Sequence, residues 1–212
     1  MCNNEKYVLP DCIFTCATLS HLKLSRCIFK LPDGTQFPNL VSLQLEHSEC
    51  FNVNRIFKRI KHLSLDGSSL KNLGSVHSLD VVLNLQSLLY DLKISVKRIS
   101  YALCLLRNSP KLYEIDIDEV VKVDETARHT TELFDYLSKT GNEVSEALNM
   151  IQTVRLRKFK GTSTEMYLIK VILAHSPKLA RMVIEQIEES NELLKDLISY
   201  HRASPNAEIK YT

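Results

Sequence analysis

One six-residue pattern recurs along most of the chain: apolar, two variable positions, apolar, one variable position, apolar. Its seven copies are LSHLKL (Leu19–Leu24), LVSLQL (Leu40–Leu45), IKHLSL (Ile60–Leu65), LYDLKI (Leu89–Ile94), LYEIDI (Leu112–Ile117), IQTVRL (Ile151–Leu156) and LARMVI (Leu179–Ile184). The last two apolar residues of a copy alternate, so they lie on one face of a short strand, and the first lies in the turn before it. One such unit cannot bury its apolar residues alone, so neighbouring units must stack.

The spacing of the copies predicts a leucine-rich-repeat solenoid. Successive copies start 21, 20, 29, 23, 39 and 28 residues apart, and leucine-rich repeats have a period of about 20–29 residues. The expected fold class is therefore α/β, a right-handed solenoid with a parallel sheet on one face and helices on the other. Three regions are expected: repeats over 1–124, a helical insertion over 125–150, and a C-terminal domain over 151–212 that continues the solenoid and closes it with a helix and a strand.

The segments between the copies carry helix signals. Helices are predicted over Val96–Arg107, around Thr131–Lys139, around Glu143–Met150, from Thr162 to His175, and in the tail with Leu194, Leu197 and Ile198 on one side. The sequence TSTE from Thr162 to Glu165 is a capping box, and a Ser-Pro pair follows the end of two of these helices. Residues Ala207–Tyr211 are expected to form a last strand.

Several of these segments resemble one family. The unit RLRKFKGTSTEMYLIKVILAHSPKLARMVIEQ (Arg155 to Gln186) resembles the FBD domain of plant F-box/FBD/leucine-rich-repeat proteins, and HRASPNAEIKY is similar to the end of that domain. The segments LPDCIFTCATLSHLKLSRCIFKLP and FPNLVSLQLEH are similar to the family's repeat region, so the resemblance runs from about Val8 onward. It implies a protein-binding module, the substrate-recognition part of an F-box (SCF-type) ubiquitin ligase component.

Family members usually begin with an F-box, which docks on the Skp-type adaptor of a cullin ubiquitin ligase. The sequence Leu9-Pro10-Asp11-Cys12-Ile13 imitates an F-box opening, but the residues after it read as a repeat strand. We therefore expect the F-box to be lacking, and the adaptor to bind only if an F-box is supplied. A fragment, a truncated gene product and a short paralogue all fit. The alternative function is that of a truncated non-ligase paralogue, acting as a decoy or scaffold binder.

Composition disfavours other classes of protein. The net charge is +2 and no Lys/Arg run reaches five residues, which argues against a nucleic-acid partner. No apolar stretch approaches the roughly 20 residues that cross a bilayer, and the first residues do not resemble a signal peptide. The six cysteines form no C-x-x-C pair, and Cys12, Cys16 and His21 lack a fourth metal ligand. Free thiols in a reducing cytoplasm or nucleus are the expectation, with no membrane partner, no metal and no cofactor.

An enzyme is not expected either, because the chain has no nucleotide-binding, zinc-protease or nucleophile-elbow motif. Asp116 and Asp118 alternate with Ile115 and Ile117, so they face outward, where in-register strands would place them opposite Arg155 and Arg157. We favour an exposed structural ladder of ion pairs. A partner-binding patch and a carboxylate pair for acid/base chemistry are the alternatives.

The outward strand positions form the predicted partner-binding surface. It comprises His21, Lys23, Gln44, Glu46, His62, Asp66, Asp91, Lys93, Glu114, Asp116, Arg155, Arg157 and Arg181. The mixed charge suits a protein partner, and an ordinary solvated surface would have the same composition. Because three residues on seven strands project roughly 300 Å², against about 800 Å² per partner in a standard interface, other segments must contribute. The insertion offers Asp124, Glu125, Arg128, His129, Tyr136 and Lys139.

Overall fold

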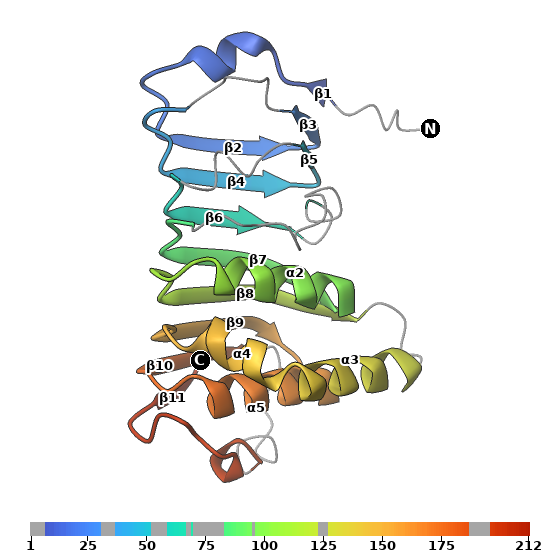
Figure 1. Cartoon of the computed structure of the whole chain (residues 1–212). Coiled ribbons are helices and arrows are strands. Elements are labelled where there is room, and N and C mark those ends of the chain that lie inside the picture. Colours follow the sequence, from blue (N-terminus) through green and yellow to red (C-terminus); the bar gives the residue numbers. More distant parts are fainter. Residues whose placement is uncertain are drawn as a thin grey trace.

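The main element of the fold is an eight-stranded parallel sheet whose strands follow one another in chain order (Figure 1). The computed structural model describes residues 7–30, 37–51, 59–66, 69, 83–94, 96–122, 127–186 and 196–212. The strands are β2 (His21–Ser25), β4 (Ser42–Glu46), β6 (His62–Leu65), β7 (Ser87–Ile94), β8 (Glu114–Lys122), β9 (Thr153–Phe159), β10 (Arg181–Gln186) and β11 (Glu208–Tyr211). Every pairing between them is parallel, as the sequence predicts.

The apolar residues of the repeated pattern form the core on one side of this sheet. Leu43 and Leu45 on β4 are 0% exposed. The apolar residue two positions before a strand is also at most 2% exposed in six successive units: Leu40, Ile60, Leu85, Leu112, Ile151 and Leu179. Burying one such side chain contributes about 1.5–3 kcal/mol, so the stacking of these triplets dominates the stability of the sheet.

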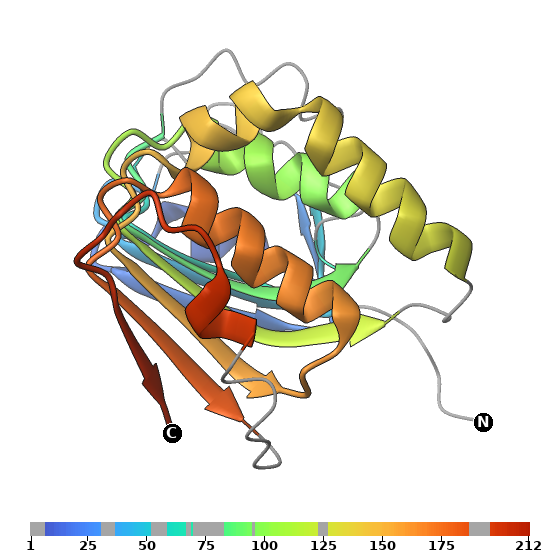
Figure 2. The ribbon, with the colours of Figure 1, turned by 90° about the horizontal axis from the view of Figure 1, so that it is seen from below.

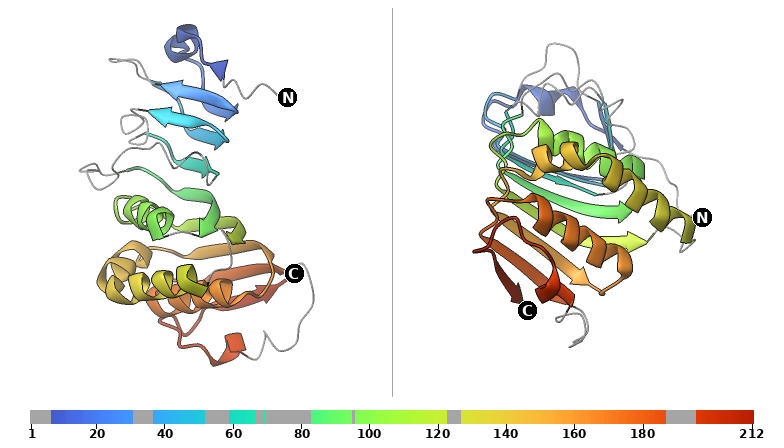
Figure 3. Two further views of the ribbon diagram at one scale, coloured as in Figure 1. Left: turned by 90° about the vertical axis from the view of Figure 1, so that its right-hand side faces the viewer. Right: turned by 60° about the horizontal axis from the view of Figure 1, so that its bottom comes forward.

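The α-helices whose full bounds lie within the described residues are on the core side of the sheet (Figure 2). They are α2 (Val96–Arg107), α3 (Ala127–Lys139), α4 (Gly141–Leu148) and α5 (Ser163–His175). Helix α4 contacts both α2 and α5, so it lies between them. It connects β8 to β9, as α2 connects β7 to β8 and α5 connects β9 to β10. Within the segment expected to be an insertion, α3 is thus the additional element. No described element covers the opposite side of the sheet, which we call the outer face (Figure 3).

The first units carry strands where helices were expected. β1 (Tyr7–Val8), β3 (Cys27–Lys30) and β5 (Glu49–Phe51) form a small parallel sheet at the carboxyl ends of β2 and β4 (Figure 1). Arg26 and His47 turn the chain at these corners with left-handed φ angles of 54° and 50°. The first units are only 20 to 21 residues long, so extended segments replace the helix that longer units contain.

The helix signals are mostly confirmed. Helix α2 has the predicted bounds, and the Thr162–Glu165 capping box is formed: the Glu165 carboxylate accepts from the Thr162 amide at 2.7 Å, and the Thr162 hydroxyl accepts from the Glu165 amide at 3.3 Å. The tail differs in one respect. Leu197 is 0% exposed, whereas Ile198, expected on the same side, is 73% exposed. Leu194 lies outside the described residues.

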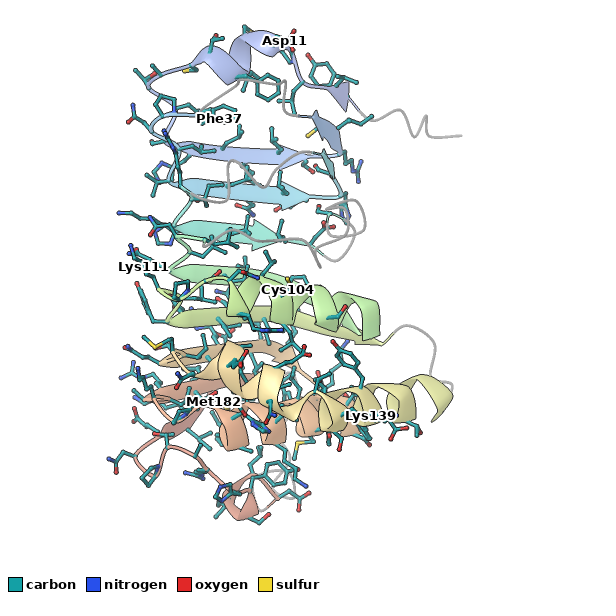
Figure 4. All side chains as sticks on the ribbon, viewed as in Figure 1. Asp11, Phe37, Cys104, Lys111, Lys139 and Met182 are labelled. Atoms are coloured by element: carbon teal, nitrogen blue, oxygen red, sulfur yellow. The ribbon has the colours of Figure 1, made fainter. Side chains whose placement is uncertain are left out.

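A short 3-10 helix, η1 (Asp11–Thr15), closes the N-terminal end of the core. Phe14 is buried there, with its ring edge-on to Phe37 (Figure 4) at a centroid distance of 5.7 Å, and Leu9 is buried in the same core. The segment that imitates an F-box opening therefore packs against the repeats.

Candidate functional site

Two rows of side chains run across all eight strands on the outer face. The first residue of each strand forms the amino row: His21, Ser42, His62, Ser87, Glu114, Thr153, Arg181 and Glu208. The third residue of each strand forms the middle row: Lys23, Gln44, Ser64, Leu89, Asp116, Arg155, Val183 and Lys210. The parallel register brings these residues side by side, so the face is one continuous surface.

The fourth unit lies in a different register from the one predicted. Leu63 pairs with Leu88 and Leu65 with Tyr90, so the repeat there is LQSLLY (Leu85–Tyr90) and not LYDLKI. The predicted residues Asp91 and Lys93 therefore leave the two rows, and Ser87 and Leu89 take their places. β7 contains the last two apolar residues of LQSLLY and all three of LYDLKI, and an irregularity lies between Tyr90 and Leu92. The side chains of Asp91 and Lys93 lie outside the described residues.

Ion pairs link the strands of the C-terminal half. As predicted, Asp116 pairs in register with Arg155, and their charged atoms are 3.7 Å apart. The second predicted contact is wrong: Arg157 donates to the Asp116 carboxylate at 2.5 Å, and Lys158 contacts Asp118 at 2.9 Å. The in-register pairing of β8 and β9 ends one residue before Arg157, and Lys158 has a left-handed φ of 51°. Arg157 thus contacts the carboxylate two residues before its expected partner Asp118, and Lys158 contacts Asp118 in its place.

Asp116 is more buried than an exposed ladder would require. The residue is 8% exposed, and its Oδ1 atom has no hydrogen-bond partner in the described part of the chain. Burial raises the pKa of this carboxyl above its usual value of 3.8, and the hydrogen bond from Arg157 opposes that shift. The Asp116 carboxyl therefore links β8 to β9, because both Arg155 and Arg157 of β9 contact it.

The N-terminal half of the face is largely neutral. Its charges lie near the carboxyl ends of the strands, where Glu46 contacts Lys23 at 2.9 Å and Asp66 contacts His47 at 2.8 Å. Gln44 donates to Glu46 at 2.8 Å. His21 and His62 are exposed in the amino row. The two halves thus differ in chemistry: the N-terminal half offers mainly hydroxyl, amide and imidazole groups beside two charge pairs, and the C-terminal half offers mainly paired charges.

Buried polar side chains at the strand ends were missed by the sequence prediction. The Ser48 hydroxyl accepts from the Cys27 amide at 3.3 Å, and the Ser69 hydroxyl accepts from the Ser48 amide at 3.2 Å. All three residues are buried. These bonds join equivalent positions of successive units, so we call Cys27, Ser48 and Ser69 the corner ladder. The signal was available: Cys27 and Ser48 each stand three residues after the last leucine of their copy.

The described residues of the segment 125–150 that the sequence offers as additional binding residues do not lie on the outer face. Asp124 and Glu125 lie outside the described residues, as do the side chains of Arg128 and His129. Tyr136 is partly buried on α3, where burial raises its phenol pKa, and Lys139 is exposed at the end of that helix (Figure 4). Because α3 is on the core side of the sheet, these residues do not extend the outer face.

Two nucleophilic side chains of the described residues, Ser145 and Cys16, have hydrogen-bond partners. Ser145 and His175 are hydrogen-bonded at 2.7 Å, yet the Ser145 hydroxyl also donates to the Gly141 carbonyl at 2.9 Å. The bond to the Gly141 carbonyl uses the hydroxyl proton, which leaves the Ser145 oxygen able to accept from the His175 ring. A hydrogen bond with Thr18 lowers the pKa of the exposed Cys16 thiol. Within the described residues, no three His, Cys, Asp or Glu side chains gather as a metal site.

A cavity of about 70 Å³ lies between the sheet and the helices. Leu88, Leu103, Ile115, Val144, Leu168 and Ile172 are among the apolar side chains that line it. The described residues that line it carry no charged side chain. Among the described helices, none has the length and apolar character needed to cross a membrane.

Comparison of the chain with protein-family models, with curated proteins and with solved structures finds no match. The outer face therefore has to be interpreted from its own geometry.

Proposed function

We propose that this chain is a leucine-rich-repeat module that binds a protein through its outer face. In this proposal it is the substrate-recognition part of an F-box-type ubiquitin ligase component, without the F-box itself. The observation that carries the proposal is the outer face: eight parallel strands present two continuous rows of mostly polar side chains that no described element covers.

The corner ladder supports the assignment to leucine-rich repeats. In those repeats an Asn or Cys follows the last leucine of the strand at the third position. Cys27 occupies that position in the first copy, and Ser48 occupies it in the second. Their hydrogen bonds link one unit to the next, and such unit-to-unit contacts stabilise repeat proteins in general.

The size of the outer face limits what it can bind alone. Seven strand spacings of about 4.8 Å and three residues per strand give roughly 340 Å² in projection, below the roughly 800 Å² per partner of a standard interface. Tyr113 and Met150 are 41% and 36% exposed just before β8 and β9. We infer that a partner also covers this rim, where Lys111 lies as well (Figure 4).

The packing of η1 supports the absence of an F-box from the described residues. Phe14 and Leu9 close the end of the core, so this segment cannot leave to dock on an adaptor without exposing apolar side chains. Adaptor binding is therefore proposed to need a separate F-box.

Proximity labelling in cells tests the proposal with matched variants. Gln44→Ala, His62→Ala, Arg155→Ala and Arg181→Ala together change the outer face, and Lys139→Ala with Lys170→Ala changes the helix side. We expect the outer-face variant to lose partners that the native chain and the helix-side variant both retain. Equal partner sets for all three would contradict the proposal. A version fused to an F-box should add the Skp-type adaptor; if it does not, the binder works outside a ligase.

A further inference from the structure

One acidic side chain on the outer face differs from all the others described there. Six carboxylates each have a basic side chain within 4.0 Å: Glu46, Asp66, Asp116, Asp118, Glu185 and Glu208. Glu114, in the middle of the amino row, has no such neighbour in the described part of the chain. Its strand partners are Ser87 on β7 and Thr153 on β9, which carry no charge.

Among the described residues, the side chains next to Glu114 on the neighbouring strands offer hydrogen-bond acceptors but no cation. Glu114, Ser87 and Thr153 are each partly buried, and adjacent strands are only about 4.8 Å apart, so the three side chains share one small area. None of these side chains makes a hydrogen bond to another described residue. Tyr113, the residue before Glu114, is 41% exposed at the same edge of the sheet.

Resting on the proposed function, we propose that Glu114 with Ser87 and Thr153 binds a lysine or arginine side chain of the partner protein. The carboxylate supplies the charge, and the two hydroxyls supply further acceptors for the N–H groups of an ammonium or guanidinium. The exposed ring of Tyr113 adds a surface on which the stem or face of such a side chain packs. A partner carboxylate or phosphate is disfavoured here, because Glu114 would repel it.

The ion pairs on the rest of the outer face make Glu114 the preferred position for a basic residue of the partner. The other charged side chains described on the C-terminal half of the face each lie within 4.0 Å of an opposite charge, so a partner charge placed there must compete with an existing ion pair. At Glu114 the partner's cation meets no competitor. We therefore expect one basic residue of the partner to be fixed at this position, while contacts along the rest of the row depend on neutral groups.

Selection of random linear peptides displayed on phage tests the inference, with the full chain as the immobilised target. We expect the native chain to enrich peptides with one fixed lysine or arginine, and E114Q to lose that enrichment. E146Q is the matched control, because Glu146 lies on α4, away from the outer face, and is already paired with Arg107. A synthetic enriched peptide should bind E114Q about 10-fold or more weakly than it binds the native chain or E146Q.

Three results would overturn the inference: no enriched peptide on the native chain, enrichment without a basic residue, or equal affinity for E114Q. Glutamine has the shape of glutamate, and an unchanged melting temperature would show that E114Q is folded. Replacing the fixed basic residue of the peptide with glutamine should weaken binding to the native chain but not to E114Q. The proposed function is judged separately, by the partners that the four-residue outer-face variant loses, so the two can fail independently.

Discussion

Replacing Ser48 with alanine tests whether the corner ladder holds successive units together. The Ser48 side chain is fully buried, accepts from the Cys27 amide at 3.3 Å, and donates to the Glu46 carbonyl at 2.9 Å. The Glu46 carbonyl keeps a bond from the Arg26 amide in the variant, but the Cys27 amide loses its side-chain acceptor. A buried N–H without a partner costs about 1–3 kcal/mol, so we expect the free energy of unfolding to fall by about 2 kcal/mol.

Thermal melting and urea denaturation measure this loss. For a chain of this length, 2 kcal/mol lowers the melting temperature by roughly 4–8 °C. Ser42→Ala is the matched control, because Ser42 is partly exposed on the outer face and its hydroxyl bonds to no described residue. Its effect should stay within about 0.5 kcal/mol. If Ser48→Ala and Ser42→Ala have the same melting temperature, the hydrogen bonds of the buried hydroxyls do not stabilise the packing of successive units.

Three further predictions follow from the packing and the charges. Thr162→Ala removes the capping box of α5 and should cost about 1 kcal/mol in urea denaturation; Thr162→Ser should cost far less. Val144→Ile adds a methyl group toward the cavity and should stabilise the chain by up to about 0.8 kcal/mol, whereas Val154→Ile, in a filled part of the core, should destabilise it. The raised pKa of Asp116 means that the native state holds its proton above 3.8, where the unfolded chain releases it. Stability relative to Asp116→Asn should therefore fall as the pH rises through this window, and a rise would contradict the assignment.

Local signals in the sequence were sufficient where one unit decides its own structure. The capping box at Thr162 and the Ser-Pro stop after His175 set the bounds of α5 without reference to the rest of the chain. The alternation of Ile115 and Ile117 with Asp116 also fixed which side chains face outward. These features depend on residues only a few positions apart, so the residue types in the sequence are enough to predict them.

Register depends on the neighbouring strand, and there the sequence was ambiguous. LQSLLY and LYDLKI both fit the apolar pattern, and the choice required Tyr90 to act as a core residue, which it does at 4% exposure. The shift by four residues moved Asp91 and Lys93 out of the two rows and brought in Ser87 and Leu89. Likewise, the contact of Arg157 with Asp116 depends on where the pairing of β8 and β9 ends.

The distances between outer-face positions of distant strands test the parallel stack most directly. Spin labels attached through a genetically encoded keto side chain leave the six cysteines in place. Labels at His62 and Arg181, four strand spacings apart, should lie roughly 19 Å apart along the sheet, and labels at His21 and Glu208, seven spacings apart, roughly 34 Å. The account predicts that the second distance clearly exceeds the first in double electron–electron resonance. Equal distances, or a shorter second one, would contradict the continuous sheet on which the binding surface depends.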